Sequence, residues 1–421
     1  MSLLLKGGMV YTGGSFSRRD ILTDKGRIVL ISEGIDVSPA VMTFSCEGKY
    51  VFPGFTDVHV HLREPGFSYK ETMRTGGMAA AHGGFTCVCA MPNLAPAPDS
   101  AALLAGQSVR AAGCAVRIFS YGCITASRKG ERVAALEEMA PFACAFSDDG
   151  SGVNDGTVME EAMIRAKRVG KVIAAHCEDS ALARGGCVHD GEFARAHALA
   201  GIPSESEYAQ IERDLYLAEK TGAAYHVCHV SAAESVRLIR RAKARGIDVT
   251  CETAPHYLFF DDSMLEDDGR FKMNPPIRSA RDRDALLEGI ADGTVDMIAT
   301  DHAPHSAEEK SGGLAGSLMG VPGLESAFAA SFTALVKGGV TDAGHLAELM
   351  SLAPSRRFSL PGQAGITRGA VADLTVVDME RKGIFDAGKT FTMAKYSPFD
   401  GLELCGAVCA TVVNGEIAWK E

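Results

Sequence analysis

The sequence predicts an α/β protein: a (β/α)8 TIM-like barrel with a small β-sandwich domain built from both termini. Three observations predict this class. Short apolar runs alternate with helix-like segments through the middle of the chain, both ends are rich in strand-like runs and turns, and polar residues close several of the apolar runs. The chain has 421 residues, of which 46% are hydrophobic and 23% are charged, and this length suffices for one large barrel with an added domain.

Both ends of the chain read as short strands separated by turns. Gly13-Gly14 marks a turn near the start, and the strand-like run 410–413 near the end leads into an Asn-Gly turn. A different pattern fills the middle. We therefore expect residues 1–50 and 370–421 to form one small β-domain and residues 51–369 to form the barrel.

Eight apolar runs rich in Val, Ile, Cys and Ala are the expected barrel strands, and they span 51–61, 84–91, 115–121, 143–148, 171–177, 223–230, 247–253 and 295–301. The helix-like stretches between them span 70–82, 99–112, 155–169, 204–221, 232–245 and 280–291. This alternation indicates βα units and a parallel sheet, and eight units suit a closed barrel whose active site lies at the carboxyl ends of the strands. A doubly wound open sheet is the rival fold, but no GxGxxG motif follows the first strand to support a dinucleotide crevice.

Polar residues end several of these strands. His59 and His61 lie two residues apart on the first strand and therefore share a face. Other expected strands end at Asp148-Asp149, His176, His229 and Asp301. In a closed barrel these ends surround one mouth, and four His with two Asp suit two Zn²⁺-like ions. An isolated HxH pair would say little, so the prediction of a metal site depends on the combination.

The remaining composition limits the partners. The formal net charge is −11, from 42 Lys and Arg against 53 Asp and Glu, with no basic run, which argues against nucleic acid and anionic membranes as partners. No apolar stretch approaches the roughly 18 residues that span a bilayer, and the start, MSLLLKG, is too short for a signal sequence. Twelve Cys without a CxxC pattern are typical of thiols in a reducing compartment. We expect a cytoplasmic protein.

Six motifs together resemble a known family. They are DVHVHLREPG at 57–66, MPN at 91–93, FSDDG at 146–150, AHCED at 175–179, KMNPP at 272–276 and ATDHAPH at 299–305. This combination resembles the dihydroorotase family of the amidohydrolase superfamily, in its long-chain class with a split β-domain. The resemblance runs from about residue 7 to the C-terminal β segment. It is more specific than HxH, which many amidohydrolases share.

The resemblance implies the reversible cyclisation of N-carbamoyl-L-aspartate to (S)-dihydroorotate, a step of de novo pyrimidine synthesis, with two zinc ions per subunit. It implies that His59 and His61 hold the first ion and that His176 and His229 hold the second. Asp149, rather than its neighbour Asp148, would bridge them, and Asp301 would bind the first ion and act as the catalytic acid and base. The chemistry agrees, because a metal ion makes hydroxide from bound water at neutral pH and a nearby carboxylate can shuttle a proton.

The family pattern also implies a substrate-binding set, namely His61, Arg63, Asn93, Asn274, His305, Met319 and Gly320. Arg63 fits a substrate carboxylate by type, because a guanidinium pairs with a carboxylate through two hydrogen bonds. Relatives usually have Phe-Gly where this chain has Met319-Gly320, so a backbone contact would survive there while side-chain packing would differ. These two residues lie in the Gly-rich stretch 311–323, which is a candidate lid.

Two alternatives stay open. Another cyclic amidohydrolase, such as an allantoinase or dihydropyrimidinase, is the first, but these enzymes, like many dihydroorotases, bridge their metals with a carboxylated Lys. No Lys lies near the end of the fourth strand here, and Lys171 opens the fifth strand at the opposite end. The second is a non-catalytic scaffold for aspartate transcarbamoylase, a class that has typically lost metal-binding His residues. The resemblance further implies a homodimer or larger assembly and a possible transcarbamoylase partner.

Overall fold

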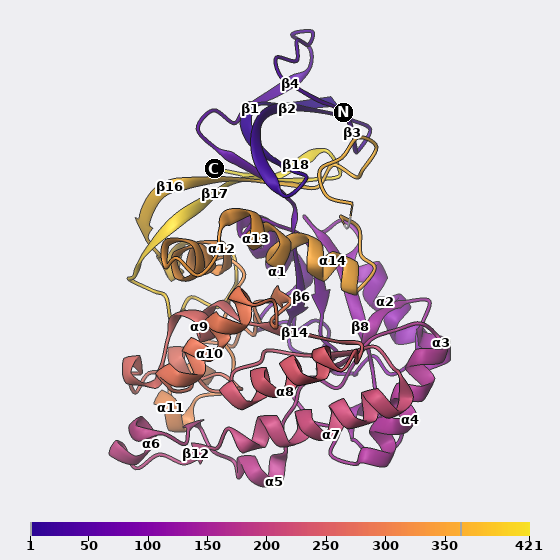
Figure 1. Cartoon of the computed structure of the whole chain (residues 1–421), viewed down its shortest axis with the longest axis vertical. Helices are drawn as coiled ribbons and strands as arrows, with labels where there is room; N and C mark the ends of the chain where they lie inside the picture. The colour runs from indigo at the N-terminus through magenta and orange to yellow at the C-terminus, as the bar shows by residue number, and fades with distance from the viewer. Residues whose placement is uncertain (1, 363) are drawn as a thin grey trace.

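The computed structural model describes residues 2–362 and 364–421, and it consists of a barrel with a second sheet above it (Figure 1). Eight parallel strands form the barrel: β6 (Phe55–Val60), β7 (Phe85–Ala90), β8 (Arg117–Cys123), β9 (Ala143–Ser147), β10 (Ile173–Ala175), β13 (Tyr225–Val227), β14 (Val249–Thr253) and β15 (Met297–Ile298). They pair in this order, and His61 N donates to His302 O at 2.8 Å to bring the two edges together. The predicted barrel is confirmed, as a nearly closed ring.

Helices cover the outside of the barrel. The longer ones are α1 (Met73–His82), α2 (Ala101–Ala111), α4 (Gly156–Arg168), α7 (Glu205–Thr221), α8 (Ala233–Ala244) and α10 (Ala280–Ala291). Three of them begin where a side chain accepts a hydrogen bond from the first helical turn, at Thr72, Ser100 and Asp155. These capping residues explain why the helices start within a few residues of their expected positions.

Shorter elements fill the connections. The helices are α3 (Leu136–Met139), α5 (Ser180–Ala183), α6 (Glu192–Ala196), α9 (Pro255–Phe259), α11 (Gly313–Gly316), α12 (Ala327–Ser331), α13 (Ala343–Ala347) and α14 (Ala353–Arg357). The 3-10 turns are η1 (Ala126–Arg128), η2 (Asp262–Met264), η3 (Gly269–Phe271), η4 (Glu308–Lys310) and η7 (Ala387–Lys389). Two π-helical turns, η5 (Phe332–Lys337) and η6 (Glu348–Leu352), continue α12 and α13, and β11 (Val188–His189) pairs with β12 (Gly201–Ile202). None of the described helices is long and apolar enough to cross a membrane.

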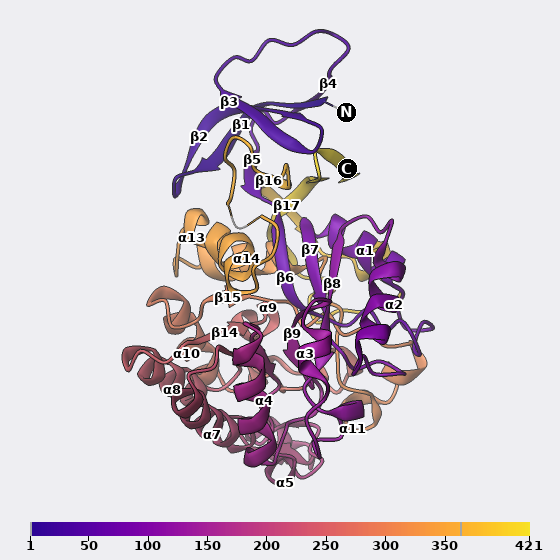
Figure 2. The ribbon, with the colours of Figure 1, turned by 90° about the vertical axis from the view of Figure 1, so that its right-hand side faces the viewer.

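The second sheet takes strands from both termini. It contains β1 (Ser2–Thr12), β2 (Ser15–Asp24), β3 (Arg27–Ser32), β4 (Met42–Ser45), β5 (Tyr50–Pro53), β16 (Leu374–Ile384), β17 (Glu403–Val413) and β18 (Glu416–Lys420). The strands pair in the order β18-β17-β16-β5-β1-β2-β3, with β4 added beside β1. Ile28 N also donates to Ala370 O at 3.0 Å, so the segment before β16 lies against β3 and the sheet curls around its own apolar core. Figure 2 shows this sheet above the barrel.

One expected strand is two strands. The run 51–61 divides at Gly54, so that β5 belongs to the terminal sheet and β6 to the barrel. Gly54 N donates to Asp373 O at 2.9 Å, and a Cβ on Gly54 would lie 2.3 Å from Thr86 Oγ1. A residue without a side chain is therefore required where the chain passes from one sheet to the other.

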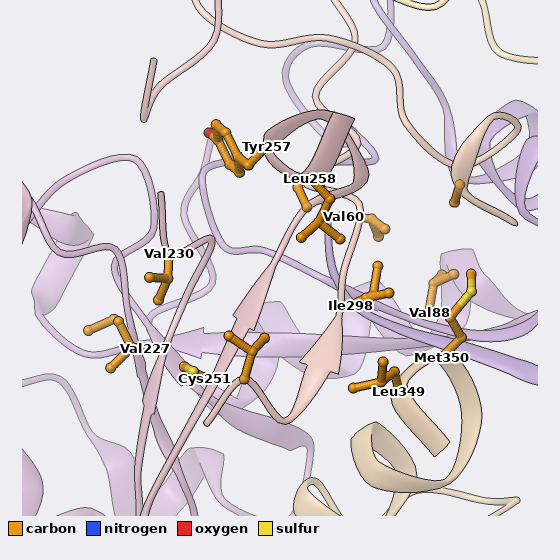
Figure 3. Packing of buried hydrophobic residues seen from close by; sticks show 14 of the residues in the cluster. Val60, Val88, Val227, Val230, Cys251, Tyr257, Leu258, Ile298, Leu349 and Met350 are labelled. Atoms are coloured by element: carbon orange, nitrogen blue, oxygen red, sulfur yellow. The ribbon is translucent and has the colours of Figure 1, made fainter. Parts of the chain in front are cut away.

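The main core lies between the barrel strands and the surrounding helices. Val60, Val227 and Ile298 from the barrel pack in one region with Leu349 and Met350 of η6 (Figure 3). A separate cluster fills the inside of the barrel and includes Tyr121 and Cys228. All twelve cysteines are free thiols, in agreement with the expectation from their spacing.

Candidate metal centre and active site

Six side chains converge at the carboxyl ends of the barrel strands, and Asp149 lies at their centre. Asp149 Oδ1 is 3.2 Å from His59 Nε2, 3.4 Å from His229 Nε2 and 3.7 Å from His176 Nδ1. Asp149 Oδ2 is 3.4 Å from His61 Nε2, and this nitrogen is 3.0 Å from Asp301 Oδ1. The structure therefore brings together every residue that the sequence predicted as a metal ligand.

The polar atoms of this cluster suit a cation. His59 Nε2 and Asp149 Oδ1 are buried and have no hydrogen-bond partner among the described residues. An unpaired buried polar atom is costly, and two of them aimed at one point indicate a missing positive charge. Ligand atoms of His59, His61 and Asp301 lie within 4.8 Å of one another, as do those of His59, Asp149 and His229. Imidazole nitrogens and carboxylate oxygens are ligands typical of zinc, so the residues fit the expected ions.

The two adjacent aspartates of the fourth strand have different surroundings. Asp148 accepts hydrogen bonds from Ile124 N at 2.8 Å and from Thr125 N at 3.1 Å. Asp149 faces the histidines instead, because neighbouring side chains point to opposite sides of an extended chain. Burial raises the pKa of Asp149, but the charge of His59 and the nearby imidazole of His229 outweigh it and hold this pKa well below its usual range. The geometry thus supports Asp149, and not Asp148, as the bridging ligand.

Three site residues have left-handed backbone conformations. The φ angles are +60° at Arg63, +32° at His229 and +47° at Asp301. Such conformations cost about 1–3 kcal/mol each in residues other than glycine and persist where the surroundings impose them. Each lies two or three residues beyond the end of a barrel strand, where the sharp turn departs from the simple alternation of a strand. Strand periodicity alone therefore does not locate His229 relative to His226.

A second layer of side chains orients the histidines. His59 Nδ1 donates to Glu252 Oε1 at 2.7 Å, and His61 Nδ1 donates to Asn93 Oδ1 at 2.7 Å. Each bond leaves the Nε2 lone pair of its histidine free to bind an ion. His226 Nε2 donates to the other oxygen of the Glu252 carboxylate, Oε2, at 3.1 Å. Sequence reasoning missed Glu252, although an acidic residue inside the apolar seventh strand is itself a signal.

Strand alternation predicts that the side chain of Cys228, the neighbour of His229, turns towards the helices. This prediction is wrong, because Cys228 lies in the barrel interior, close to His59 and Glu252. The left-handed turn at His229 shifts the alternation by one position and accounts for the error.

A cavity of about 230 Å³ opens beside the six residues. It is lined by His61, Arg63, Asn93, Asp149, Gly150, His176, His229, Asn274, Asp301, Ala303, His305, Met319 and Gly320. All seven residues expected to bind substrate are among them, whereas His59 lies behind the wall. No lysine lines the cavity in the part of the chain that the structure describes, and Lys171 Nζ bonds Ala143 O at the opposite end of β9.

The walls of the cavity are held in place by neighbouring groups. Arg63 is 8% exposed, and its Nε donates to Pro304 O at 3.0 Å. Asn274 Nδ2 donates to Glu178 Oε1 at 3.0 Å, and sequence reasoning did not single out Glu178. Gly320 has φ +134°, and a Cβ there would lie 2.6 Å from Ala303 O, so only glycine fits this wall.

The expected lid is anchored by one buried ammonium group. Lys310 Nζ donates to the carbonyl oxygens of Lys272, Leu318 and Gly320, each at 2.9 Å. An ammonium group has three N–H donors, so this arrangement uses all of them. The end of the 311–323 segment is therefore tied to the segment that carries Asn274.

Comparisons with known proteins identify the family of this chain. The family model described as "Dihydro-orotase-like" matches residues 48–235. A protein named dihydroorotase from Listeria innocua is 44% identical over 426 residues, which cover 100% of this chain and 99% of that relative. The chain belongs to the dihydroorotase family. A dihydroorotase from Macrococcus caseolyticus is 43% identical with the same coverage, so the predicted family is confirmed along the full chain.

The fold of this chain is similar to the folds of solved hydantoinases. An L-hydantoinase (dihydropyrimidinase) from Arthrobacter aurescens has a TM-score of 0.88 and 26% identity, over 99% of this chain and 95% of that one. A D-hydantoinase from Thermus sp. has a TM-score of 0.87 and 25% identity with the same coverage. These likenesses confirm the barrel and terminal sheet, while the more similar relatives carry the dihydroorotase name.

Proposed function

We propose that this chain is a dihydroorotase that interconverts N-carbamoyl-L-aspartate and (S)-dihydroorotate in de novo pyrimidine synthesis. The observation that carries the proposal is the cavity in which five of the six proposed metal ligands meet Arg63 and His305, with His59 directly behind them. Relatives named dihydroorotase match the full chain at 43–44% identity, which favours this reaction over hydantoin hydrolysis.

Two zinc ions are the proposed cofactors. His59, His61 and Asp301 would hold one ion, His176 and His229 would hold the other, and Asp149 would lie between them. When bound, the ions supply a nucleophile at neutral pH and polarise the carbonyl of the ring. The unpaired buried atoms of His59 and Asp149 support this assignment.

The protein residues perform the binding and proton transfer. Arg63, the Asn93 amide and His305 would bind the substrate's α-carboxylate, and Asn274 with the backbone of Met319 and Gly320 would contact the ring or carbamoyl group. Asp301 would accept a proton from the attacking water and deliver it to the leaving ring nitrogen as the C–N bond breaks. In the cyclisation direction, Asp301 would take that proton from the carbamoyl nitrogen and return it to the departing water.

The same cavity argues against a hydantoinase. Dihydropyrimidinase and hydantoinase substrates lack the α-carboxylate, so a buried arginine at the wall would be left without a partner of opposite charge. Arg63 is buried beside His305 in this cavity, and its guanidinium bonds no carboxylate among the described residues. An anionic substrate group would meet this need.

We also propose a homodimer or larger assembly in the cytoplasm, with aspartate transcarbamoylase as a possible partner. The family resemblance supports these proposals. Light scattering of the purified protein would test the assembly, and co-purification with the transcarbamoylase would test the partner.

A substrate panel with elemental analysis tests the function. The zinc-loaded protein is expected to turn over dihydroorotate and neither hydantoin nor allantoin. Asp149→Asn is expected to lose zinc and activity, whereas the matched Asp148→Asn variant keeps its zinc. Turnover of hydantoin or allantoin without dihydroorotate would overturn the proposal, and zinc loss only in Asp148→Asn would reverse the choice of bridge.

A further inference from the structure

A buried lysine contacts the cavity residue His305 from behind. Lys70 lies in the turn that follows Arg63, its side chain is 9% exposed, and its Nζ is 3.1 Å from His305 Nδ1. Glu309 Oε1 lies 2.9 Å from the same Nζ and pairs with its charge. Tyr69 OH donates to the same oxygen, Glu309 Oε1, at 3.0 Å, and Ser306 N donates to Glu309 Oε2 at 3.0 Å. The ammonium group is therefore fixed in place.

This contact determines which ring nitrogen of His305 carries the proton. An ammonium group only donates hydrogen bonds, so His305 Nδ1 must offer a lone pair to Lys70. A neutral imidazole has one N–H, which is then on Nε2. On the other side of the ring, Met319 O is 2.8 Å from Nε2 and accepts that N–H.

The alternative tautomer would create two unfavourable contacts. A proton on Nδ1 would face the Lys70 ammonium at 3.1 Å, donor against donor. The bare Nε2 would face Met319 O at 2.8 Å, acceptor against acceptor. The gains would be two longer contacts, a bond from Nδ1 to Glu309 Oε2 at 3.3 Å and a bond from Arg63 Nη2 to the bare Nε2 at 3.4 Å. The two shorter contacts, with Lys70 and Met319, favour Nε2–H. Burial and the neighbouring charges of Arg63 and Lys70 also lower the pKa of His305 to about 3, so the ring is neutral.

We propose that Lys70 is a positioning residue that fixes His305 as the neutral Nε2–H tautomer. The cavity then holds an N–H donor beside Arg63, whose Nη2 lies 3.4 Å from His305 Nε2, and a bound carboxylate would accept this N–H in place of Met319 O. Two adjacent donors select an anionic carboxylate over a neutral group, and a lone pair at Nε2 would repel it. The identity of that carboxylate rests on the proposed function, whereas the tautomer does not.

The experiment combines ¹⁵N spectroscopy with kinetics on the zinc-loaded full chain. Protein labelled with ¹⁵N-histidine is expected to show His305 as the Nε2–H tautomer, with the signal assigned by its loss in His305→Asn. Lys70→Met is expected to move the signal towards the Nδ1–H form. It should raise KM for dihydroorotate about tenfold or more while kcat stays within about twofold, since one hydrogen bond to a charged group is lost. Lys70→Arg keeps a cationic donor and is expected to restore both readouts in part.

The control is Tyr69→Phe, which removes a contact to Glu309 without touching His305 and should leave the tautomer and KM near wild type. An Nδ1–H signal in the wild type would overturn the proposal. So would an unchanged signal and KM in Lys70→Met, or in Lys70→Gln if the methionine variant does not fold. Failure of the wild type to turn over dihydroorotate would overturn the proposed function instead, and the spectra would still test the tautomer.

Discussion

Substituting Glu252 by Gln tests the layer of side chains behind the metal centre. Glu252 is 1% exposed, and its carboxylate accepts hydrogen bonds from His59 Nδ1 at 2.7 Å and His226 Nε2 at 3.1 Å. Burial alone raises the pKa of Glu252, but these bonds lower it to about 2, so the group is ionised. A glutamine has only one acceptor oxygen, so it can accept from one of these two histidines. Its NH₂ group then faces the other histidine.

The expected loss of zinc affinity follows from the change at His59. If the amide donates to His59 Nδ1, the ring proton moves to Nε2, the nitrogen that faces Asp149 and Asp301, and blocks it as a ligand. Loss of such a partner typically costs about 10–100-fold in metal affinity, or about 1.4–2.7 kcal/mol. We expect Glu252→Gln to weaken zinc binding by this factor.

The assay is zinc occupancy at a series of buffered free-zinc concentrations, measured by elemental analysis. Asp148→Asn is the matched control, because Asp148 is an equally buried carboxylate whose recorded partners are Ile124 and Thr125 and no histidine. This control should lose stability and keep its zinc affinity. Equal zinc affinity in Glu252→Gln and wild type would refute the reasoning that the carboxylate sets the state of His59.

Three further predictions follow from other contacts. Arg63→Met is expected to raise KM for dihydroorotate about tenfold or more with normal zinc content, because a charged hydrogen bond is lost; unchanged steady-state kinetics would remove Arg63 from the site. Lys310→Met is expected to lower the free energy of unfolding by about 2–4 kcal/mol, because three carbonyl groups lose a buried donor; a urea titration with the wild-type midpoint would contradict this. For Glu309, burial raises the pKa, but hydrogen bonds from Lys70 and Ser306 lower it to about 2. Its unfolded pKa is about 4.3, so its stabilising contribution is present above that pH and is lost as the pH falls towards 2. The difference in unfolding free energy between wild type and Glu309→Gln should therefore shrink from about pH 5 to about pH 2, and a constant difference would argue against the ion pair with Lys70.

The sequence by itself predicted the barrel because its signal is local. Apolar runs and amphipathic segments alternate along the chain, and each barrel strand and long helix lies within a few residues of its expected range. The convergence of the proposed metal ligands was also predictable, since parallel strands of a barrel present their carboxyl ends at one mouth. His61, His176 and Asp301 are far apart in the chain, yet each ends or follows an apolar run.

Tertiary structure alone decided how these residues are oriented. The tautomers of His59 and His305 depend on Glu252 and Lys70, which approach from other segments and follow no spacing rule. The left-handed turn at His229, which placed Cys228 against expectation, is imposed by packing and not by local preference. Periodicity along one strand predicts which face a side chain shares, whereas proton positions depend on contacts between segments distant in the sequence.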